Sequence, residues 1–212
     1  MKTIFLSLAL IGCCAAYTLF PPFREVLEVH NSLRSSIAKG TYVAKGTKLP
    51  PGANILKMKW DQNLEDDAVR YVNTCPKNVS NTDGVGENLY SIMVDESLNT
   101  IAAIDDAVNA TKAWVATFQE KGWNSNILDK ATFSTETAQA IQMTWAKTGS
   151  MGCGYQWCER GQWKKGWSRF VMICKYNVRY VWNEEIYKQG ATCSACPPPT
   201  KCEEVSGLCV GV

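Results

Sequence analysis

The chain has 212 residues, with 22 Lys and Arg against 20 Asp and Glu, so its formal net charge at pH 7 is only +2. This near-neutral balance excludes the strongly basic surface that binds nucleic acid, and it predicts no general attraction to membranes. The length suits one main domain with a substantial core, followed by a small tail.

Residues 1–16 have the pattern of a signal peptide. Lys2 supplies the charged start, residues 4–11 are apolar but too few to span a bilayer, and Cys14-Ala15-Ala16 offers small residues for cleavage. A short membrane anchor is the alternative, and it is disfavoured because no second hydrophobic run follows. We therefore expect a secreted, extracellular protein without a transmembrane segment.

The cysteine count predicts disulfides. Of the 10 Cys, Cys13 and Cys14 lie in the expected signal peptide, which leaves 8 in the mature chain. An even number in an oxidising compartment indicates four disulfides, and metal binding by Cys-x-x-Cys thiols is the weaker alternative. Their pairing stays open, since eight Cys can pair in roughly a hundred ways. Asn78-Val-Ser80 and Asn109-Ala-Thr111 are acceptor sequences for glycans at Asn78 and Asn109.

Three helices are predicted along the first two thirds of the chain. Residues 23–38 carry one apolar stripe at three- and four-residue steps, with Pro21 and Pro22 before it and Gly40 after it. Asp61 is a plausible N-cap for a second helix. A third helix is predicted over residues 102–120, with these side chains inward: Ile104, Val108, Ala113, Trp114, Val115 and Phe118.

The last third is predicted to form strands and a tail. Residues 139–145, 151–157 and 167–176 alternate or run apolar in the manner of strands, which after helices indicates an α+β layered domain. The tail, residues 190–212, has four Cys and almost no apolar side chains to bury, so we expect disulfides to supply its rigidity.

Several runs resemble the CAP superfamily, the cysteine-rich secretory, antigen-five and pathogenesis-related proteins. They are Gly86-Glu-Asn-Leu-Tyr90, His30-Asn-Ser-Leu-Arg34 and the segment from Trp60 to Ala68. The tail resembles the hinge of nematode venom-allergen-like proteins of the Ancylostoma-secreted-protein branch. The resemblance implies an α-β-α sandwich with a central antiparallel sheet over residues 17–189 and a hinge over 190–212. It favours the disulfides Cys75–Cys158, Cys153–Cys174, Cys193–Cys202 and Cys196–Cys209.

In that family two His and two Glu face a central cleft and can hold a divalent metal. The resemblance places Val79, Glu87, Thr117 and Gln139 at these four positions, so only the Glu87 carboxylate is kept. Zn²⁺ needs three or four N, S or O ligands, and we therefore predict no metal and no cofactor. A half-buried Glu87 that accepts hydrogen bonds from neighbouring amides and hydroxyls is the favoured interpretation.

His30 is the single histidine of the chain, so any Ser-His-Asp or Cys-His machinery would have to use it. It lies between Leu27 and Leu33 on the apolar stripe, which favours a buried, hydrogen-bonded histidine over a catalytic one. One acid without a partner base suggests no reaction, and we predict that the protein is not an enzyme.

Binding is then the expected role, and residues 160–169 are the densest candidate surface. Trp and Arg are enriched at energetic hot spots of interfaces, and this run also concentrates positive charge. The candidates are Arg160, Trp163, Lys164, Lys165, Trp167 and Arg169. The alternative is that both Trp cover the sheet while the Lys side chains are solvated.

The resemblance implies an extracellular effector that acts on host cells or host proteins. Members of this branch include antagonists of leukocyte and platelet adhesion receptors, which makes an integrin a specific hypothesis, although the chain has no Arg-Gly-Asp or Lys-Gly-Asp. The alternative is an extracellular sterol- or fatty-acid-binding protein with Trp114, Phe118 and Trp123 lining a groove, but aromatic residues at helical spacing are more often core.

Overall fold

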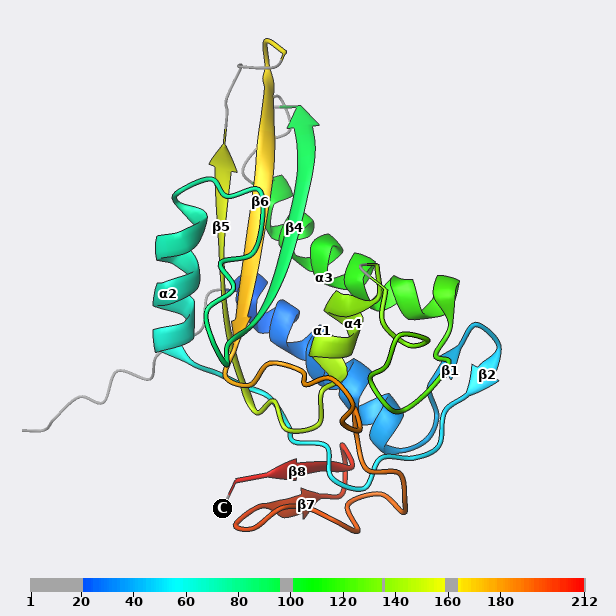
Figure 1. The fold of residues 1–212 in the computed structure, drawn as a ribbon. Coiled ribbons are helices and arrows are strands. Elements are labelled where there is room, and N and C mark those ends of the chain that lie inside the picture. The colour runs from blue at the N-terminus through cyan, green and yellow to red at the C-terminus, as the bar shows by residue number, and fades with distance from the viewer. Residues whose placement is uncertain (1–20, 96–100, 135, 159–163, 212) are drawn as a thin grey trace, which may run out of the picture.

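The computed structural model describes residues 21–95, 101–134, 136–158 and 164–211. Figure 1 shows three layers, a central sheet with helices on both of its faces. The expected signal peptide, Arg160 and Trp163 lie outside the described residues. The helices are α1 (Pro21–Ala38), α2 (Gln62–Val72), α3 (Ile101–Lys121) and α4 (Ala138–Thr144).

The central sheet has four strands in the order β3-β5-β6-β4. Here β3 is Lys59–Trp60, β4 is Gly86–Asp95, β5 is Ser150–Cys158 and β6 is Trp167–Tyr176. The β4–β6 and β5–β6 pairs are antiparallel, and only the short β3 runs parallel to β5. The strands β1 (Val43–Ala44) and β2 (Thr47–Lys48) form one small hairpin, and β7 (Lys201–Glu203) and β8 (Leu208–Val210) form another. The predicted α-β-α arrangement is thus confirmed.

The prediction of a strand over residues 139–145 is wrong, since this segment forms α4. Its residues 140–144 are all buried, the polar ones included. The alternation of apolar and polar residues in this segment therefore does not mark one buried and one exposed face, as it would in a strand. The third long strand of the sheet is β4, which the sequence analysis did not predict. α1 begins two residues early, at Pro21, because proline is tolerated in the first turn of a helix. Ala113, expected inward, is exposed.

The predicted cap of α2 is confirmed, and the helix lies unusually close to the sheet. The Asp61 carboxylate accepts hydrogen bonds from the backbone N–H groups of Asn63 and Leu64. A Cβ atom at Gly152 of β5 would lie 2.1 Å from the backbone nitrogen of Glu65. Only glycine therefore permits this approach of helix and strand.

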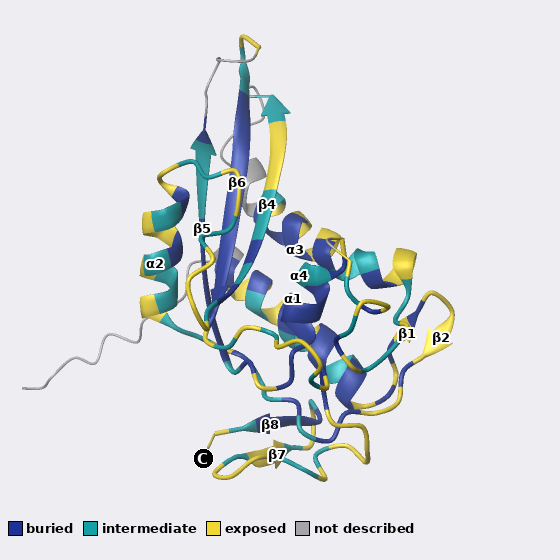
Figure 2. Cartoon of the chain, viewed as in Figure 1, coloured by how far each residue is buried: buried dark blue, intermediate teal, exposed yellow. Residues whose placement is uncertain are grey.

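All four disulfides favoured by the resemblance are present: Cys75–Cys158, Cys153–Cys174, Cys193–Cys202 and Cys196–Cys209. The tail, however, does not depend on disulfides alone. Leu208 and Cys209 are buried, and Leu208 belongs to the main hydrophobic cluster. Figure 2 shows this buried strand, β8, facing the body of the domain while β7 is largely exposed.

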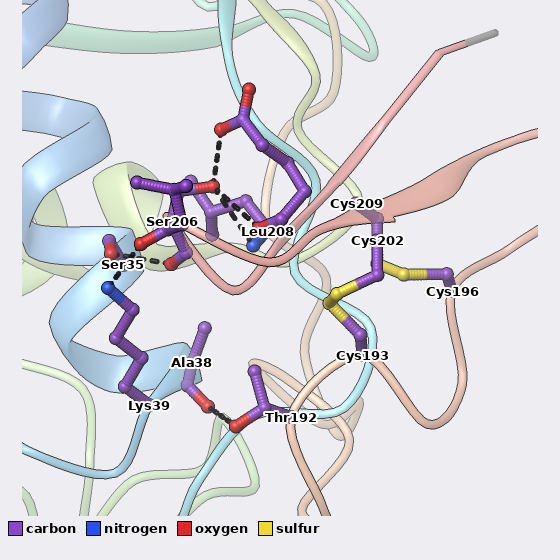
Figure 3. Close-up of a disulfide and its surroundings, with 12 residues drawn as sticks. Ser35, Ala38, Lys39, Thr192, Cys193, Cys196, Cys202, Ser206, Leu208 and Cys209 are labelled. Atoms are coloured by element: carbon purple, nitrogen blue, oxygen red, sulfur yellow. Dashed lines mark hydrogen bonds between the residues drawn. A yellow bond between two sulfur atoms is a disulfide. The ribbon is translucent and has the colours of Figure 1, made fainter.

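Figure 3 shows how the tail attaches to the C-terminal end of α1. The Ser35 hydroxyl donates to the Ser206 carbonyl oxygen, and the Thr192 hydroxyl donates to that of Ala38 at 2.8 Å. Together with the Lys57–Glu203 ion pair, these bonds join the tail to the domain as one packed unit.

Candidate functional site

Glu87 lies at the start of β4 and its side chain is only 3% exposed. The carboxylate accepts hydrogen bonds from the backbone N–H groups of Ser80 and Asn81 and from the Ser80 hydroxyl. Its Oε1 atom also lies 3.0 Å from Nζ of Lys175. Glu87 therefore anchors the loop before β4, which is the structural role that the sequence analysis favoured for it.

Lys175 is a buried cation between two carboxylates. Its side chain is 2% exposed and its Nζ lies 2.5 Å from Oδ2 of Asp67 on α2 as well as beside Glu87. Burial opposes the charged form of Lys175, but the hydrogen bonds and charges of Asp67 and Glu87 outweigh it and raise the pKa of the ammonium. The hydrogen bond from Lys175 in turn lowers the pKa of Asp67.

Three of the four positions that the resemblance placed at a metal cleft, Glu87, Thr117 and Gln139, are engaged by other groups. Successive side chains of a strand point to opposite faces, so Glu87 faces Lys175 and Asp67 on the α2 side. Asn88 points the other way and donates to the carbonyl oxygen of Gln139 on α4 at 3.1 Å. The Thr117 hydroxyl donates to the Trp114 carbonyl within α3 at 2.8 Å. Val79 brings no ligand atom.

These residues do not fit a divalent metal, because the single carboxylate among them is already held by a cation and three hydrogen-bond donors. Within the part of the chain that the structure describes, one group of metal-capable side chains lies close together, Cys193, Cys196 and Cys209. All three sulfur atoms are in disulfides. The absence of a metal nevertheless stays a prediction from donor chemistry.

His30 is fully buried and hydrogen-bonded at both ring nitrogens. Nδ1 lies 2.8 Å from the Val26 carbonyl oxygen, which can only accept, so Nδ1 carries the proton and Nε2 accepts from the Tyr176 hydroxyl at 2.9 Å. Burial lowers the pKa of His30 to about 4, and the nearby Arg34 charge adds to this effect. The Tyr176 hydroxyl also accepts from Asn88 at 3.1 Å. This is a satisfied structural network without access to a substrate.

The candidate binding run of residues 160–169 divides in the structure. Lys164 and Lys165 are exposed, and Trp167 is half-buried with Nζ of Lys164 4.4 Å from its ring centroid. Arg169 must be removed from the candidate surface, because it is 8% exposed and donates to the carbonyl oxygens of Pro76 and Cys75 at 3.0 and 2.9 Å. It fastens the hairpin to the loop that follows α2.

Sequence reasoning missed two exposed apolar residues beside this hairpin. Ile92 and Met93 on β4 are 42% and 37% exposed, and Met93 pairs with Arg169 in the sheet register. The signal that could have located them is the uncharged run from Asn88 to Val94, which combines β-branched and aromatic residues.

The aromatic residues proposed to line a lipid groove do not do so. Trp114 and Phe118 are buried in the main core, and Trp123 packs on Phe118 with ring centroids 4.7 Å apart. A groove does lie between α1 and α3, with a volume of about 470 Å³. Its lining includes Val29, Leu33, Tyr42, Val115 and Lys112.

The asparagines of both glycan acceptor sequences, Asn78 and Asn109, are exposed, and their glycosylation stays a prediction. No helix within the described ranges combines the length and the apolar character needed to cross a membrane.

Comparison with known proteins agrees with this architecture. The profile of the cysteine-rich secretory protein (CAP) family matches residues 27–176. The "Ancylostoma secreted protein" of Ancylostoma caninum is 32% identical over 194 residues, which cover 86% of this chain and 42% of that protein. The chain thus spans less than half the length of this relative. "Salivary antigen-5" of Dipetalogaster maximus is 28% identical over 79% of this chain and 66% of its own length.

Solved structures match over nearly the whole chain. The structure described as NaASP2 with Zn²⁺ gives a TM-score of 0.76 at 29% identity, covering 93% of this chain and 100% of that one. BmVAL-1 gives a TM-score of 0.78 at 28% identity, over 94% and 98% of the two chains. The hookworm platelet inhibitor, at 20% identity and a TM-score of 0.66 over 92% of each chain, shares the fold. The profile match, the three-layer sandwich and the disulfides together show that this chain belongs to the CAP family.

Proposed function

We propose that the protein is a secreted, non-enzymatic effector that binds a host cell-surface or extracellular protein. The observation that carries this proposal is the loop end of the β5–β6 hairpin, where Lys164, Lys165 and Trp167 lie close to firmly anchored residues. The disulfide Cys75–Cys158 and the buried Arg169 both fasten the hairpin to the loop after α2. A surface that is ordered before binding loses less conformational entropy on docking.

The chemistry of this surface favours an acidic partner. The Lys164 ammonium lies over the Trp167 ring, and the exposed Lys165 adds a second positive charge beside it. Aromatic and cationic groups placed together are typical of interface hot spots. An adhesion receptor of leukocytes or platelets, such as an integrin, is the partner we propose. The fold shared with the hookworm platelet inhibitor makes platelets the first cells to test.

We propose that the protein is not an enzyme, because the side chains that could act as a general base, His30 and Glu87, are already hydrogen-bonded within the protein. His30 is buried in a closed hydrogen-bond network, and the Glu87 carboxylate is held by Lys175 and the loop before β4. A general base must reach the proton that it abstracts, and neither group is presented to a substrate.

The hairpin can be tested with two matched pairs of lysine substitutions. We expect Lys164→Ala with Lys165→Ala to weaken binding to platelets or purified integrins by about tenfold or more, since hot-spot truncations have effects of this size. Lys45→Ala with Lys48→Ala removes two exposed positive charges elsewhere and should leave binding unchanged. Surface plasmon resonance and platelet adhesion measure both. Equal binding by the two double variants would exclude the hairpin.

The groove between α1 and α3 supports a second candidate function, the binding of a fatty acid or sterol. Its volume of about 470 Å³ lies in the range of small-molecule sites, and Val29, Leu33 and Val115 give it apolar walls. Lys112 also lines the groove and lies 4.0 Å from Glu25, so a lipid carboxylate would take the place of Glu25 as its partner. Lipid extraction and mass spectrometry of the native protein test this function, and a Val115→Trp variant that fills the groove should lose any lipid found. Lipid retained by that variant would place the ligand elsewhere.

A further inference from the structure

The strand β4 forms one edge of the central sheet. It pairs with β6 on one side, and among the described residues no strand pairs with its other side. Figure 1 shows β4 as the outermost long strand. Its residues 91–93 are exposed, and Figure 2 shows the same outer half of the strand open to solvent.

The disulfide Cys153–Cys174 identifies which backbone groups of β4 point outward. These two residues face each other across β5 and β6 with Cα atoms 4.0 Å apart. So short a distance marks a pair without mutual backbone hydrogen bonds, so the N–H and C=O of Cys174 point away from β5 and toward β4. The partner of Cys174 on β4 is Asn88, whose backbone groups therefore bond to β6.

The alternation along a strand then directs the backbone groups of Leu89, Ser91 and Met93 away from the sheet. The same alternation is visible on β5, where the carbonyl oxygens of Gly149 and Met151 accept from β3 and its C-terminal neighbour rather than from β6. Across the described ranges, no backbone hydrogen bond engages the outward groups of Leu89, Ser91 or Met93.

A row of unpaired N–H and C=O groups is a template for another strand, and proteins commonly protect such edges with charged residues, proline or a bulge. None of these protects the run from Asn88 to Val94. The run has no charged residue and no proline, and its register with β6 is unbroken. Ile92 and Met93 add exposed apolar surface to the same edge.

We propose that β4 pairs antiparallel with β4 of a second copy of this chain, in a register centred on Ser91. A twofold axis through Ser91 pairs the outward groups of Ser91 with those of the second Ser91 and the groups of Leu89 with those of Met93. All three outward residues are then satisfied at once, and the interface is self-complementary as a twofold dimer requires. The two four-stranded sheets become one continuous sheet.

The side chains support this register. Tyr90 of each copy lies opposite Ile92 of the other copy. Both pairs are of the closely spaced kind, in which the two residues share no backbone hydrogen bonds. Aromatic and β-branched residues placed opposite each other are among the favourable cross-strand pairs. Glu87 comes opposite Asp95 just beyond the paired run, and its charge is already compensated by Lys175.

The dimer is tested by sedimentation velocity of the full secreted protein at increasing concentration. We expect the mass to double, and Ile92→Lys to return it to that of a single chain because two ammonium groups would enter the contact. Val181→Lys is the matched control, since Val181 is 46% exposed against 42% for Ile92 and belongs to no strand of the sheet. A wild type that stays a single chain up to its solubility limit would overturn the proposal, as would an undiminished dimer in Ile92→Lys.

The register is tested by single cysteines under mild oxidation. Ser91→Cys should give a covalent dimer, because a hydrogen-bonded antiparallel pair has a Cα distance of about 5.5 Å, which suits a disulfide. Leu89→Cys should not, because two copies of this position would be offset by about 14 Å along the strands, four residues at 3.4 Å each. Peptide mapping that retains the four native disulfides shows that each variant is folded. Cross-linking by Leu89→Cys in preference to Ser91→Cys would refute the register.

A different occupant of the edge would also be detected. If the protein alone remains a single chain while another protein protects the amides of Leu89, Ser91 and Met93 from hydrogen exchange, the edge serves that protein and the dimer proposal fails.

Discussion

Three polar side chains of α1 connect this helix to distant backbone segments. Arg34 is fully buried and its N–H groups donate to the carbonyl oxygens of five residues, Leu56, Met143, Trp145, Ala146 and Thr148. Asn31 exchanges two hydrogen bonds of 2.9 Å with the backbone of Met58. Together with His30, these residues give the His-Asn-Ser-Leu-Arg run a structural role, because their side chains hydrogen-bond to segments far away in the sequence.

His30 should make folding stability depend on pH in a defined window. Its pKa in the folded protein is about 4, against about 6.5 in an unfolded chain. The unfolded state therefore binds more protons below pH 6.5, and the free energy of unfolding falls as the pH drops from 6.5 toward 4. The expected loss from His30 between pH 7 and pH 5 is about 2 kcal/mol.

Chemical denaturation of the wild type and of His30→Gln at both pH values checks this effect. The Gln side chain does not titrate, so the difference between the two proteins removes the contribution of acidic groups such as Asp67. A loss of stability equal in the two proteins would show that His30 titrates normally in the folded state.

At the scale of elements, the contact between α2 and β5 depends on glycine. A Cβ at Gly152 would meet the backbone of Leu64 and Glu65 within 2.6 Å, and backbone atoms cannot rotate out of the way. We expect Gly152→Ala to lower the free energy of unfolding by about 3 kcal/mol, at the upper end of overpacking effects. Thermal or urea unfolding measures it.

Gly211→Ala is the control for this substitution, because no atom lies within 4 Å of the added Cβ. It should change stability by less than about 0.5 kcal/mol. If Gly152→Ala is as stable as Gly211→Ala, α2 packs further from β5 than the structure has it.

The sequence was sufficient where local chemistry determined the element. The Asp61 cap and the stripe of α1 depend on neighbours within a few residues, and both predictions are confirmed. The segment that forms α4 resembles a strand in sequence, because a helix buried on all sides has no polar face and so lacks the 3.6-residue repeat of apolar positions. The charge of Arg169 favours exposure, but the fold buries this side chain and supplies the carbonyl oxygens that accept its hydrogen bonds.

At the scale of the candidate site, the sequence lists the side chains at the four positions but does not say what each of them contacts. The sequence alone shows that Val79, Thr117 and Gln139 stand where the resemblance implies two His and one Glu. Lys175 was overlooked, although it determines what Glu87 does, because the two residues are 88 positions apart and meet only through the β4–β6 register.

At the scale of the whole molecule, the tail and the main domain share one core. Leu208 on β8 is fully buried within the main cluster, and the backbone of Cys209 exchanges hydrogen bonds with Ile55 and Lys57. The disulfides Cys193–Cys202 and Cys196–Cys209 restrict the tail locally. Contacts of the tail with α1 and with the segment before β3 hold it against the main domain. Truncation of a buried side chain of the tail should consequently destabilise the entire protein and not the tail alone.

Leu208→Ala provides the test of this shared core. We expect it to lower the free energy of unfolding of the whole chain by about 3 kcal/mol in one cooperative transition, as for other buried Leu→Ala changes. Val205→Ala, in the same hairpin but 87% exposed, should stay within about 0.5 kcal/mol of the wild type. Tryptophan fluorescence reports the domain, since the chain's 8 Trp all precede residue 190. If Leu208→Ala leaves that transition in place while hydrogen exchange in residues 190–211 rises, the tail folds as a separate unit.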